Sequence, residues 1–462
     1  MKHIHRAATA AALAFVMTLT PFPARAPAAD AAIETGAYSA DAMKAMLLAT
    51  AILASTPTDI YRVLLNPIDP TPPASDEETA RLEEPPPESS PPAEDLHSDD
   101  YYTIQERSKE IAEEVVRISK KYGAYGGVEV AVIAGGEISG TYAYGYAERA
   151  SRAMTAETPM RVASLSKVVL GMVALSMQEQ GIIDIDSDIS EYWGGAVRNP
   201  YYKDTPITIR HILTHTSSIS ALGDDASRSG SSIRSRLLGG NAFSRVKPGA
   251  ISSHIYNNYG FAVLGVTLEV AANETVNSYA RRMLFEPLGI DAAFGSGSLI
   301  NTDNIAVLYR ANGAIARSAS AQKANVGNTY PGASGTAFAG GLTISASDLA
   351  KLIAVLANGG VYNGVRVLSE DSVAQIETSV GYTGAYLQCA PLRYSWGAFG
   401  QDAVYWHTGS AYGVFNAVVY NTITRNGVVV LTTGASGAKD PIGIYKICSE
   451  ITNYTFGLLS AA

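Results

Sequence analysis

Three short motifs, Ser164-Leu165-Ser166-Lys167, Tyr256-Asn257-Asn258 and His407-Thr408-Gly409, occur in this order along a chain of 462 residues. Each motif alone carries little weight, because patterns of three or four residues often arise by chance. The Ser-x-x-Lys pattern begins again at three serines whose surrounding sequence indicates no chemistry: Ser244, Ser320 and Ser436. The ordered set is more specific than its parts, and it predicts a single active site.

The first motif has the spacing that a serine nucleophile and its base require. If Ser164 opens a helix, Lys167 lies one turn further along the same face, where its amine can reach the hydroxyl. The almost wholly apolar run over 168–175 predicts that this helix is buried inside the domain. Burial favours a neutral lysine, which can accept the serine proton, and the N–H groups of a helix start stabilise an oxyanion. An isolated Ser-x-x-Lys is more often a solvated lysine on an ordinary helix.

The second motif contains the only Tyr-x-Asn of the sequence and follows the turn signal Pro248-Gly249. A phenol beside a lysine can carry a proton between nucleophile and leaving group, and the amide of Asn258 can bind a substrate amide. Without the other motifs, a buried tyrosine next to a turn asparagine is the better interpretation of Tyr256.

The third motif precedes an alternating run over 414–420, which together with a second run over 428–432 predicts a β-hairpin. We therefore expect His407 to Gly409 on or beside a strand. Gly409 would let a substrate backbone approach that strand closely, and His407 would supply a donor or a titratable charge. Taken alone, His407 would be a surface histidine before a turn.

Together the motifs resemble the serine β-lactamase and penicillin-binding-protein superfamily. The resemblance is to the branch with class C β-lactamases, D,D-carboxypeptidases, D-aminopeptidases and lactamase-like esterases (peptidase family S12 type). Similar blocks cover most of the chain beyond residue 101: 207–217, 259–265, 287–289, 339–342 and 347–349. The resemblance implies an α/β (α+β) fold, in which an antiparallel sheet is flanked by helices and a mostly helical region is inserted.

The resemblance assigns the catalytic roles residue by residue. Ser164 would be the nucleophile, Lys167 its base and Tyr256 the proton shuttle. The backbone N–H groups of Ser164 and Ser410 would form the oxyanion hole. The implied reaction is acylation of Ser164 followed by hydrolysis or transfer, and it needs no metal and no cofactor.

The resemblance also assigns the residues that bind substrate: Asn258, His407, Thr408 and Gly409. His407 takes the place of a lysine found in many lactamases. His211 and His215 are four residues apart, as in some metal sites, but the resemblance places both in a helix that supports the active site. Because no carboxylate ligand pattern accompanies them, we interpret these two histidines as structural.

The N-terminus predicts export. Basic residues precede a mostly apolar stretch over 7–19 and a small-residue cleavage site, so residues 1–28 are expected to be a secretory signal peptide. The product would be secreted or periplasmic. The longest later apolar window, residues 45–54, is too short to span a bilayer, so we expect no integral membrane segment after cleavage.

Composition divides the remaining chain. Residues 29–65 form an N-terminal extension with helical apolar content, and residues 66–100 hold eleven acidic residues, nine prolines, one arginine and no aromatic residue. The latter stretch is predicted to be a disordered linker. Its charge of about −10 accounts for the net charge of −9 of the whole chain, so nothing indicates nucleic-acid binding. Residues 101–462 are expected to form the hydrolase domain, beginning with a helix over 103–121.

Two cysteines, Cys389 and Cys448, remain after signal cleavage. In an exported protein such a pair favours a disulfide, which would tie the region before His407 to the final helix.

The substrate class stays open among several alternatives. Histidine in the third motif favours, by resemblance, a D-stereospecific peptidase acting on cell-wall-type or D-amino-acid peptides. A carboxypeptidase holds its substrate carboxylate most simply with an arginine, yet residues 395–406 contain neither Lys nor Arg, and Arg393 is the nearest cation. This absence counts against a strict carboxypeptidase and leaves an endo-acting D-peptidase, a D-aminopeptidase and an esterase as alternatives. A β-lactamase or lactamase-like esterase is a further alternative, so the partner is a small peptide, β-lactam or ester, or peptidoglycan. A penicillin-binding sensor without turnover would need a transmembrane segment.

Overall fold

The computed structural model describes residues 102–105, 109–220 and 227–461. The predicted signal peptide, N-terminal extension and acidic linker, which span residues 1–100, lie outside these ranges.

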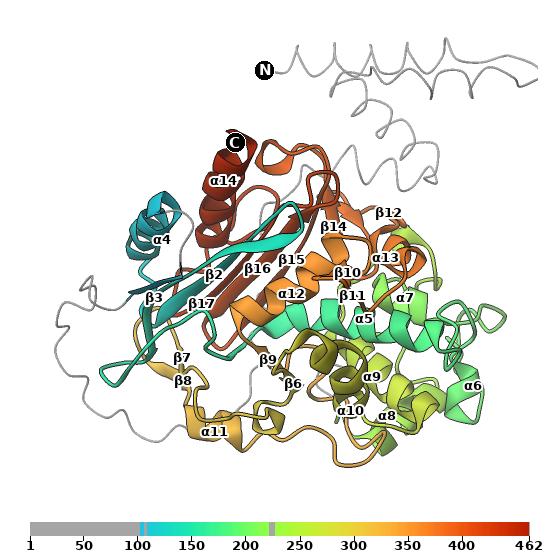
Figure 1. The fold of residues 1–462 in the computed structure, drawn as a ribbon. Helices are drawn as coiled ribbons and strands as arrows, with labels where there is room; N and C mark the ends of the chain where they lie inside the picture. The colour runs from blue at the N-terminus through green and yellow to red at the C-terminus, as the bar shows by residue number, and fades with distance from the viewer. Residues whose placement is uncertain (1–101, 106–108, 221–226, 462) are drawn as a thin grey trace, which may run out of the picture. The chain divides into compact units, whose positions relative to one another are not determined.

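A ten-stranded sheet with the order β1-β3-β2-β17-β16-β15-β14-β13-β12, and β4 attached to β3, forms the centre of the described part. Its N-terminal strands are β1 (Tyr102–Gln105), β2 (Gly127–Ala134), β3 (Glu137–Glu148) and β4 (Arg152–Ala153). Its C-terminal strands are β12 (Gly381–Tyr382), β13 (Leu387–Gln388), β14 (Arg393–Ser395), β15 (Val404–Ala411), β16 (Val414–Asn421) and β17 (Gly427–Thr433). The two groups meet where β17 pairs antiparallel with β2 (Figure 1). The predicted antiparallel sheet is confirmed.

Alternate residues of the strands face two separate cores, as the two-residue period of a strand requires. Val428 and Val430 of β17 contribute to the core under α4 (Lys109–Lys121) and α14 (Lys446–Ala461). The intervening residues contribute to a larger core on the opposite face, where α12 (Ala346–Ala357) packs against the sheet. Figure 1 shows α4 and α14 together on one face and α12 on the other.

The region inserted between β4 and β12 is mostly helical, as expected. Its helices are α5 (Ser166–Glu179), α6 (Ser190–Trp193), α7 (Ile209–Leu213), α8 (Gly230–Leu238), α9 (Asn258–Ala272), α10 (Val276–Ala280), α11 (Ala319–Lys323), α12 and α13 (Glu370–Glu377). Its short strands are β5 (Met160–Arg161), β6 (Ala293–Phe294), β7 (Leu308–Tyr309), β8 (Ile315–Arg317), β9 (Leu342–Ile344), β10 (Val361–Tyr362) and β11 (Val365–Arg366). Residues Ser166 to Met177 of α5 are all buried, so the apolar run after the first motif forms an interior helix.

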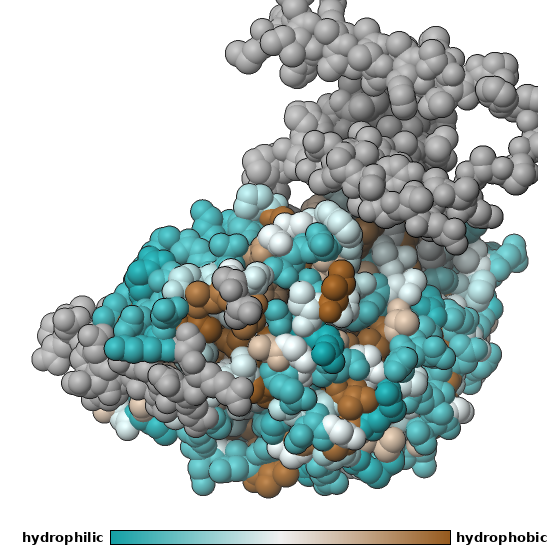
Figure 2. Space-filling model, turned by 45° about the horizontal axis from the view of Figure 1, so that its top comes forward, coloured by the Kyte–Doolittle hydropathy of each residue, from teal (hydrophilic) through white to brown (hydrophobic). Residues whose placement is uncertain are grey.

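The outer surface contrasts with this interior. On the face seen in Figure 2, hydrophilic side chains predominate, and apolar ones occur in smaller groups. Among the helices that the structure describes, none is both long enough and apolar enough to cross a membrane.

The predicted disulfide is not formed. Cys389 and Cys448 are both buried free thiols. Cys389 belongs to the core on the α12 face of the sheet and Cys448 to the core under α14, so the sheet lies between them. Burial raises the pKa of the Cys389 thiol to about 12 and also raises the pKa of Cys448. The number and compartment of cysteines carry no information about which face of a sheet each one occupies.

Candidate active site

Ser164 lies in a tight turn immediately before α5. The 3-10 helix η3 (Ala163–Leu165) contains Ser164, and α5 begins two residues later at Ser166. Ala163 has a φ of 50°, a left-handed conformation that non-glycine residues rarely adopt. The Ser166 hydroxyl holds the turn, because it donates to the Ala163 carbonyl at 2.6 Å and accepts from the Leu342 N–H at 2.9 Å. The sequence prediction that Ser164 opens the helix is therefore corrected: it precedes the helix and remains partly exposed.

Lys167 is fully buried and reaches three oxygen atoms. Its Nζ lies 3.0 Å from Ser164 Oγ, 2.8 Å from Asn258 Oδ1 and 2.7 Å from the Ala339 carbonyl oxygen. The last two atoms can only accept hydrogen bonds. In the neutral amine, the two N–H bonds would therefore point to Asn258 and Ala339. The nitrogen lone pair would then face the Ser164 hydroxyl, which is the geometry of a base.

The Tyr256 phenol lies near two side chains that carry or can carry positive charge, Lys167 and Arg393, and near two imidazoles. The ring centroid lies 4.9 Å from Lys167 Nζ and 5.7 Å from the Arg393 guanidinium carbon. The imidazole of His215 lies 4.4 Å away and that of His407 6.4 Å away, centroid to centroid. Positive charge on one side of an aromatic face is attracted by the ring, and it also stabilises a phenolate during proton transfer.

Local capping fixes the second motif. Asn257 is the N-cap of α9, with its Oδ1 accepting from the Gly260 N–H at 3.1 Å. Asn258 is thus the first residue of the helix, and its Oδ1 accepts a hydrogen bond from Lys167 Nζ. Tyr256 precedes the cap in the chain. The cap explains why a tyrosine and an asparagine two residues apart approach the same lysine.

His407 is buried and held in one tautomer. Its Nδ1 donates to the Thr408 carbonyl oxygen at 2.7 Å, so in the neutral ring Nε2 carries the lone pair. That Nε2 is buried and has no hydrogen-bond partner in the described part of the chain. Burial, then the charges of Arg393 and Lys167, lower the pKa of His407 well below its usual value. Of the two predicted roles, the structure therefore disfavours that of a charged group near neutral pH.

Gly409 and Ser410 lie on β15 next to the nucleophile. A Cβ atom at Gly409 would lie 2.2 Å from the Val162 carbonyl oxygen and 3.3 Å from the Ser164 nitrogen, so only glycine fits there. Strand β14 pairs with β15 only at residues 404–406, which leaves the later part of the edge of β15 beside the Ser164 turn. This arrangement brings the predicted oxyanion-hole residues, Ser164 and Ser410, to the same edge, and Ser410 is exposed there.

Arg393 is a site residue that the sequence prediction set aside. It lies on β14, opposite Trp406 of β15, and its Nη1 is 3.4 Å from the Thr408 hydroxyl oxygen. Its guanidinium carbon lies 4.9 Å from the Trp406 ring and 4.7 Å from the Tyr386 ring. Residues 395–406 contain no cation, but the neighbouring strand β14 brings Arg393 to this position. The sequence signal that could have identified Arg393 was its place on the strand that precedes the strand of His407 in the same hairpin.

The comparisons agree with this fold and motif set. Residues 113–446 match the family model described as Beta-lactamase, which is more than half of the chain, and the chain therefore belongs to the β-lactamase family. The superfamily and fold that the sequence predicts are thereby confirmed.

A curated relative is the D-alanyl-D-alanine-carboxypeptidase/endopeptidase AmpH of Escherichia coli K12. It is 32% identical over 63 residues, which are 14% of this chain and 16% of that protein. The matches to this and another curated relative span 36% of their length or less. Two solved structures share the fold. The octameric penicillin-binding protein homologue of Pyrococcus abyssi has a TM-score of 0.61 and 21% identity, over 76% of this chain and 77% of that one. The D-amino acid amidase of Ochrobactrum anthropi has a TM-score of 0.58 and 18% identity, over 76% and 99%.

Proposed function

We propose that this protein is an exported serine hydrolase that forms an acyl-enzyme at Ser164 and acts as a D-stereospecific peptidase on cell-wall-type or D-amino-acid peptides. The observation that carries the proposal is Arg393, whose guanidinium lies beside Thr408 and Tyr256. An arginine is the side chain best suited to hold a peptide carboxylate. This favours a D,D-carboxypeptidase over a D-aminopeptidase, and AmpH is a partial sequence relative with that name.

In the proposed acylation, the substrate carbonyl oxygen accepts hydrogen bonds from the N–H groups of Ser164 and Ser410. The Ser164 Oγ forms a bond to the carbonyl carbon while its proton moves to the neutral amine of Lys167, 3.0 Å away. The tetrahedral oxyanion collapses, the carbon–nitrogen bond breaks, and the leaving amine takes a proton through Tyr256. Water then attacks the ester, returns a proton to Ser164 and releases the product.

A β-lactamase or esterase is the second candidate, because the chain belongs to the β-lactamase family. A lactam ring or an ester would use the same nucleophile, base and oxyanion hole, and of the two only a simple ester offers no carboxylate to Arg393. The third alternative, a penicillin-binding sensor, would stop at the acyl-enzyme.

Four substrates given to the purified protein separate these functions. They are a peptide ending in D-Ala-D-Ala, the same peptide as its C-terminal amide, a chromogenic cephalosporin and a nitrophenyl ester. We expect the free acid to have the highest kcat/KM, and Arg393→Gln to lower this value roughly 10- to 100-fold for the acid but not for the amide. Equal loss on both peptides, or preference for the cephalosporin or the ester, would contradict the carboxypeptidase proposal. A stable adduct on Ser164 without turnover of any substrate would support the sensor.

Export is proposed from the sequence of residues 1–28 alone. Sequencing the N-terminus of the protein from its native cells tests it. A mature chain that starts near residue 29 outside the cytoplasm supports export, and an intact cytoplasmic chain contradicts it.

A further inference from the structure

His215 is not inside a helix, contrary to the expectation from the resemblance. Helix α7 ends at Leu213, and His215 follows with a φ of 58°, in the left-handed region. The side chain is buried, and its ring lies 4.4 Å from the ring of Tyr256 at an interplanar angle of 34°. A strained backbone conformation persists only where the surroundings fix it, and such residues cluster at functional sites.

His215 contacts the chain on both sides of Tyr256. The Ile255 N–H donates to the His215 carbonyl oxygen at 3.0 Å, and the Asn257 N–H donates to His215 Nδ1 at 3.2 Å. The tyrosine is therefore bracketed by two hydrogen bonds to a single residue, while the imidazole of that residue packs against its ring.

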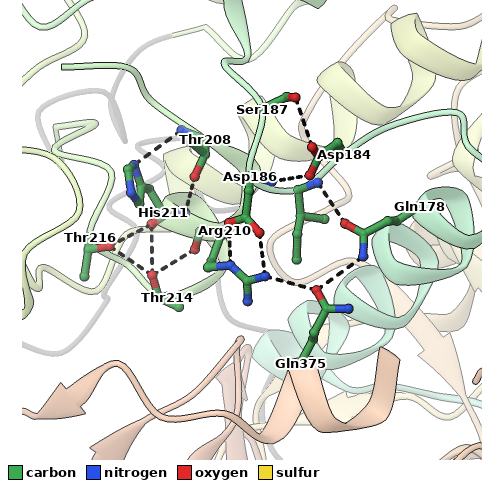
Figure 3. A network of polar contacts seen from close by, with 11 residues as sticks. Gln178, Asp184, Asp186, Ser187, Thr208, Arg210, His211, Thr214, Thr216 and Gln375 are labelled. Carbon is green, nitrogen blue, oxygen red and sulfur yellow. Dashed lines mark hydrogen bonds and ion pairs between the residues drawn. The ribbon is translucent and has the colours of Figure 1, made fainter. Parts of the chain in front are cut away.

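A polar network around α7 includes the residues before and after His215, Thr214 and Thr216 (Figure 3). The Thr216 N–H donates to the His211 carbonyl oxygen at 2.8 Å, and the Thr214 and Thr216 hydroxyl oxygens lie 2.9 Å apart. Further out, Arg210 bonds to Asp186 at 2.6 Å, and Figure 3 shows this pair beside α5 and α13. The residues before and after His215 are thus tied to the rest of the domain.

Only the neutral imidazole can make this set of contacts. Because Nδ1 accepts the Asn257 N–H, the ring proton is on Nε2, and Nε2 is buried without a partner in the described part of the chain. A second proton on Nδ1 would face the Asn257 N–H, donor against donor. Burial lowers the pKa of His215 well below its usual value, and the nearby charges of His254, Lys167, His407 and Arg393 act in the same direction.

We propose that His215 is a positioning residue, which as a neutral imidazole fixes the Tyr256 phenol in the geometry for proton transfer. The proposal rests on the proposed function in one respect, namely that Tyr256 carries the proton of the acylation step. In this proposal the ring of His215 orients the phenol, and its Nδ1 holds the loop that carries the phenol.

Two substitutions separate the role of the His215 ring from the role of its hydrogen-bond acceptor, Nδ1. His215→Asn keeps an acceptor near Nδ1 and tolerates a positive φ, whereas His215→Phe keeps a ring against Tyr256 and leaves the Asn257 N–H without its partner. We expect His215→Phe to lower kcat about 100-fold with KM nearly unchanged, and His215→Asn to restore about 10-fold of that loss. The control His211→Asn alters a neighbouring histidine that caps α7, and it should leave kcat unchanged in folded protein. Equal kcat for His215→Phe and wild type would overturn the proposal.

A second measurement does not depend on activity. Protein labelled with 3-fluorotyrosine gives one 19F resonance for each tyrosine, and the spectrum of Tyr256→Phe identifies that of Tyr256. We expect this resonance to be sharp in wild type and to show no titration around pH 6.5, the ordinary pKa of an imidazole, and to shift or broaden in His215→Phe. An unchanged resonance in His215→Phe would overturn the proposal even if kcat fell. If the resonances behave as expected but wild-type protein is inactive on every substrate, the proposed function is wrong while the positioning of Tyr256 by His215 is still supported.

Discussion

The same four-residue pattern has two opposite environments in this molecule. Ser164 immediately precedes the interior helix α5, and Lys167 lies in the first turn of this helix, fully buried and with its amine 3.0 Å from the serine hydroxyl. Ser320 and Lys323 lie in the short surface helix α11, where Lys323 pairs with the exposed Asp303 at 3.0 Å. The spacing of a motif brings two side chains to one face of a helix, but their burial decides whether they form a reactive pair or an ordinary surface pair.

The largest effect that tests this comparison is loss of the nucleophile. We expect Ser164→Ala to lower turnover by at least about 10⁴-fold, because it removes the hydroxyl that lies 3.0 Å from Lys167 Nζ. The decoy variant Ser320→Ala should keep wild-type rates. Steady-state kinetics on the best substrate, with circular dichroism to verify folding, measures both. Inactivity of folded Ser320→Ala beside an active Ser164→Ala would reverse the assignment.

The next effect concerns the shared proton. Lys167→Ala and Tyr256→Phe should each slow acylation by about 10²- to 10⁴-fold, since both residues serve one transfer. The double variant should lose far less than the product of the two single losses, as for other residues that act as a unit. Single-turnover acylation rates give this comparison, with Lys323→Ala as the matched lysine that should change nothing. Multiplicative losses would show that the two residues act independently.

The third effect is steric. It compares Gly409, where β15 lies close to the Ser164 turn, with a glycine that has open space around it. A methyl group at Gly409 would meet the Val162 carbonyl oxygen at 2.2 Å, so Gly409→Ala must displace β15 from the nucleophile. We expect about a 100-fold loss of kcat and a destabilisation of about 1–3 kcal/mol. The matched variant Gly457→Ala, on α14 with open space around it, should be neutral or slightly stabilising. Thermal melting and kinetics measure both effects. A Gly409→Ala protein with wild-type stability and wild-type kcat would show that β15 does not lie this close to the Ser164 turn.

The sequence predicts the sheet shared by both chain ends and the motif residues, because these depend on local pattern and order. It does not predict contacts that depend on register or on a single unusual torsion. Arg393 reaches the site only through the β14–β15 pairing, and His215 only through its positive φ.

Tertiary pairing also overrides local pattern near the N-terminus of the domain. The helix predicted over 103–121 is confirmed over 109–121, where α4 lies, and is wrong at 103–105, which belong to β1 and pair with β3. The same limit explains the incorrect disulfide, because two cysteines on opposite faces of one sheet cannot be recognised from their spacing.

The smallest effect is the dependence of stability on pH, and it follows from four histidines and Glu377, whose pKa values burial shifts. Burial lowers the pKa of His211, His215, His254 and His407, so below about pH 6.5 the unfolded chain binds protons that the folded chain does not. The free energy of unfolding should therefore fall as the pH drops below about 6.5, by up to about 1.4 kcal/mol per pH unit for each histidine.

Glu377 opposes this trend. Burial, only partly offset by the Tyr420 hydroxyl, raises its pKa to about 7, so its contribution is fully present below the unfolded value and is lost as the pH rises through 7. We expect Glu377→Gln to steepen the fall of the unfolding free energy between about pH 6.5 and 5. His215→Asn should make this fall less steep, by the slope that corresponds to about one bound proton. The control Asp303→Asn, which breaks the exposed pair beside the decoy serine, should leave the profile unchanged. Urea titrations at several pH values measure these slopes, and a wild-type stability that rises toward pH 5 would show that the histidines are not held neutral.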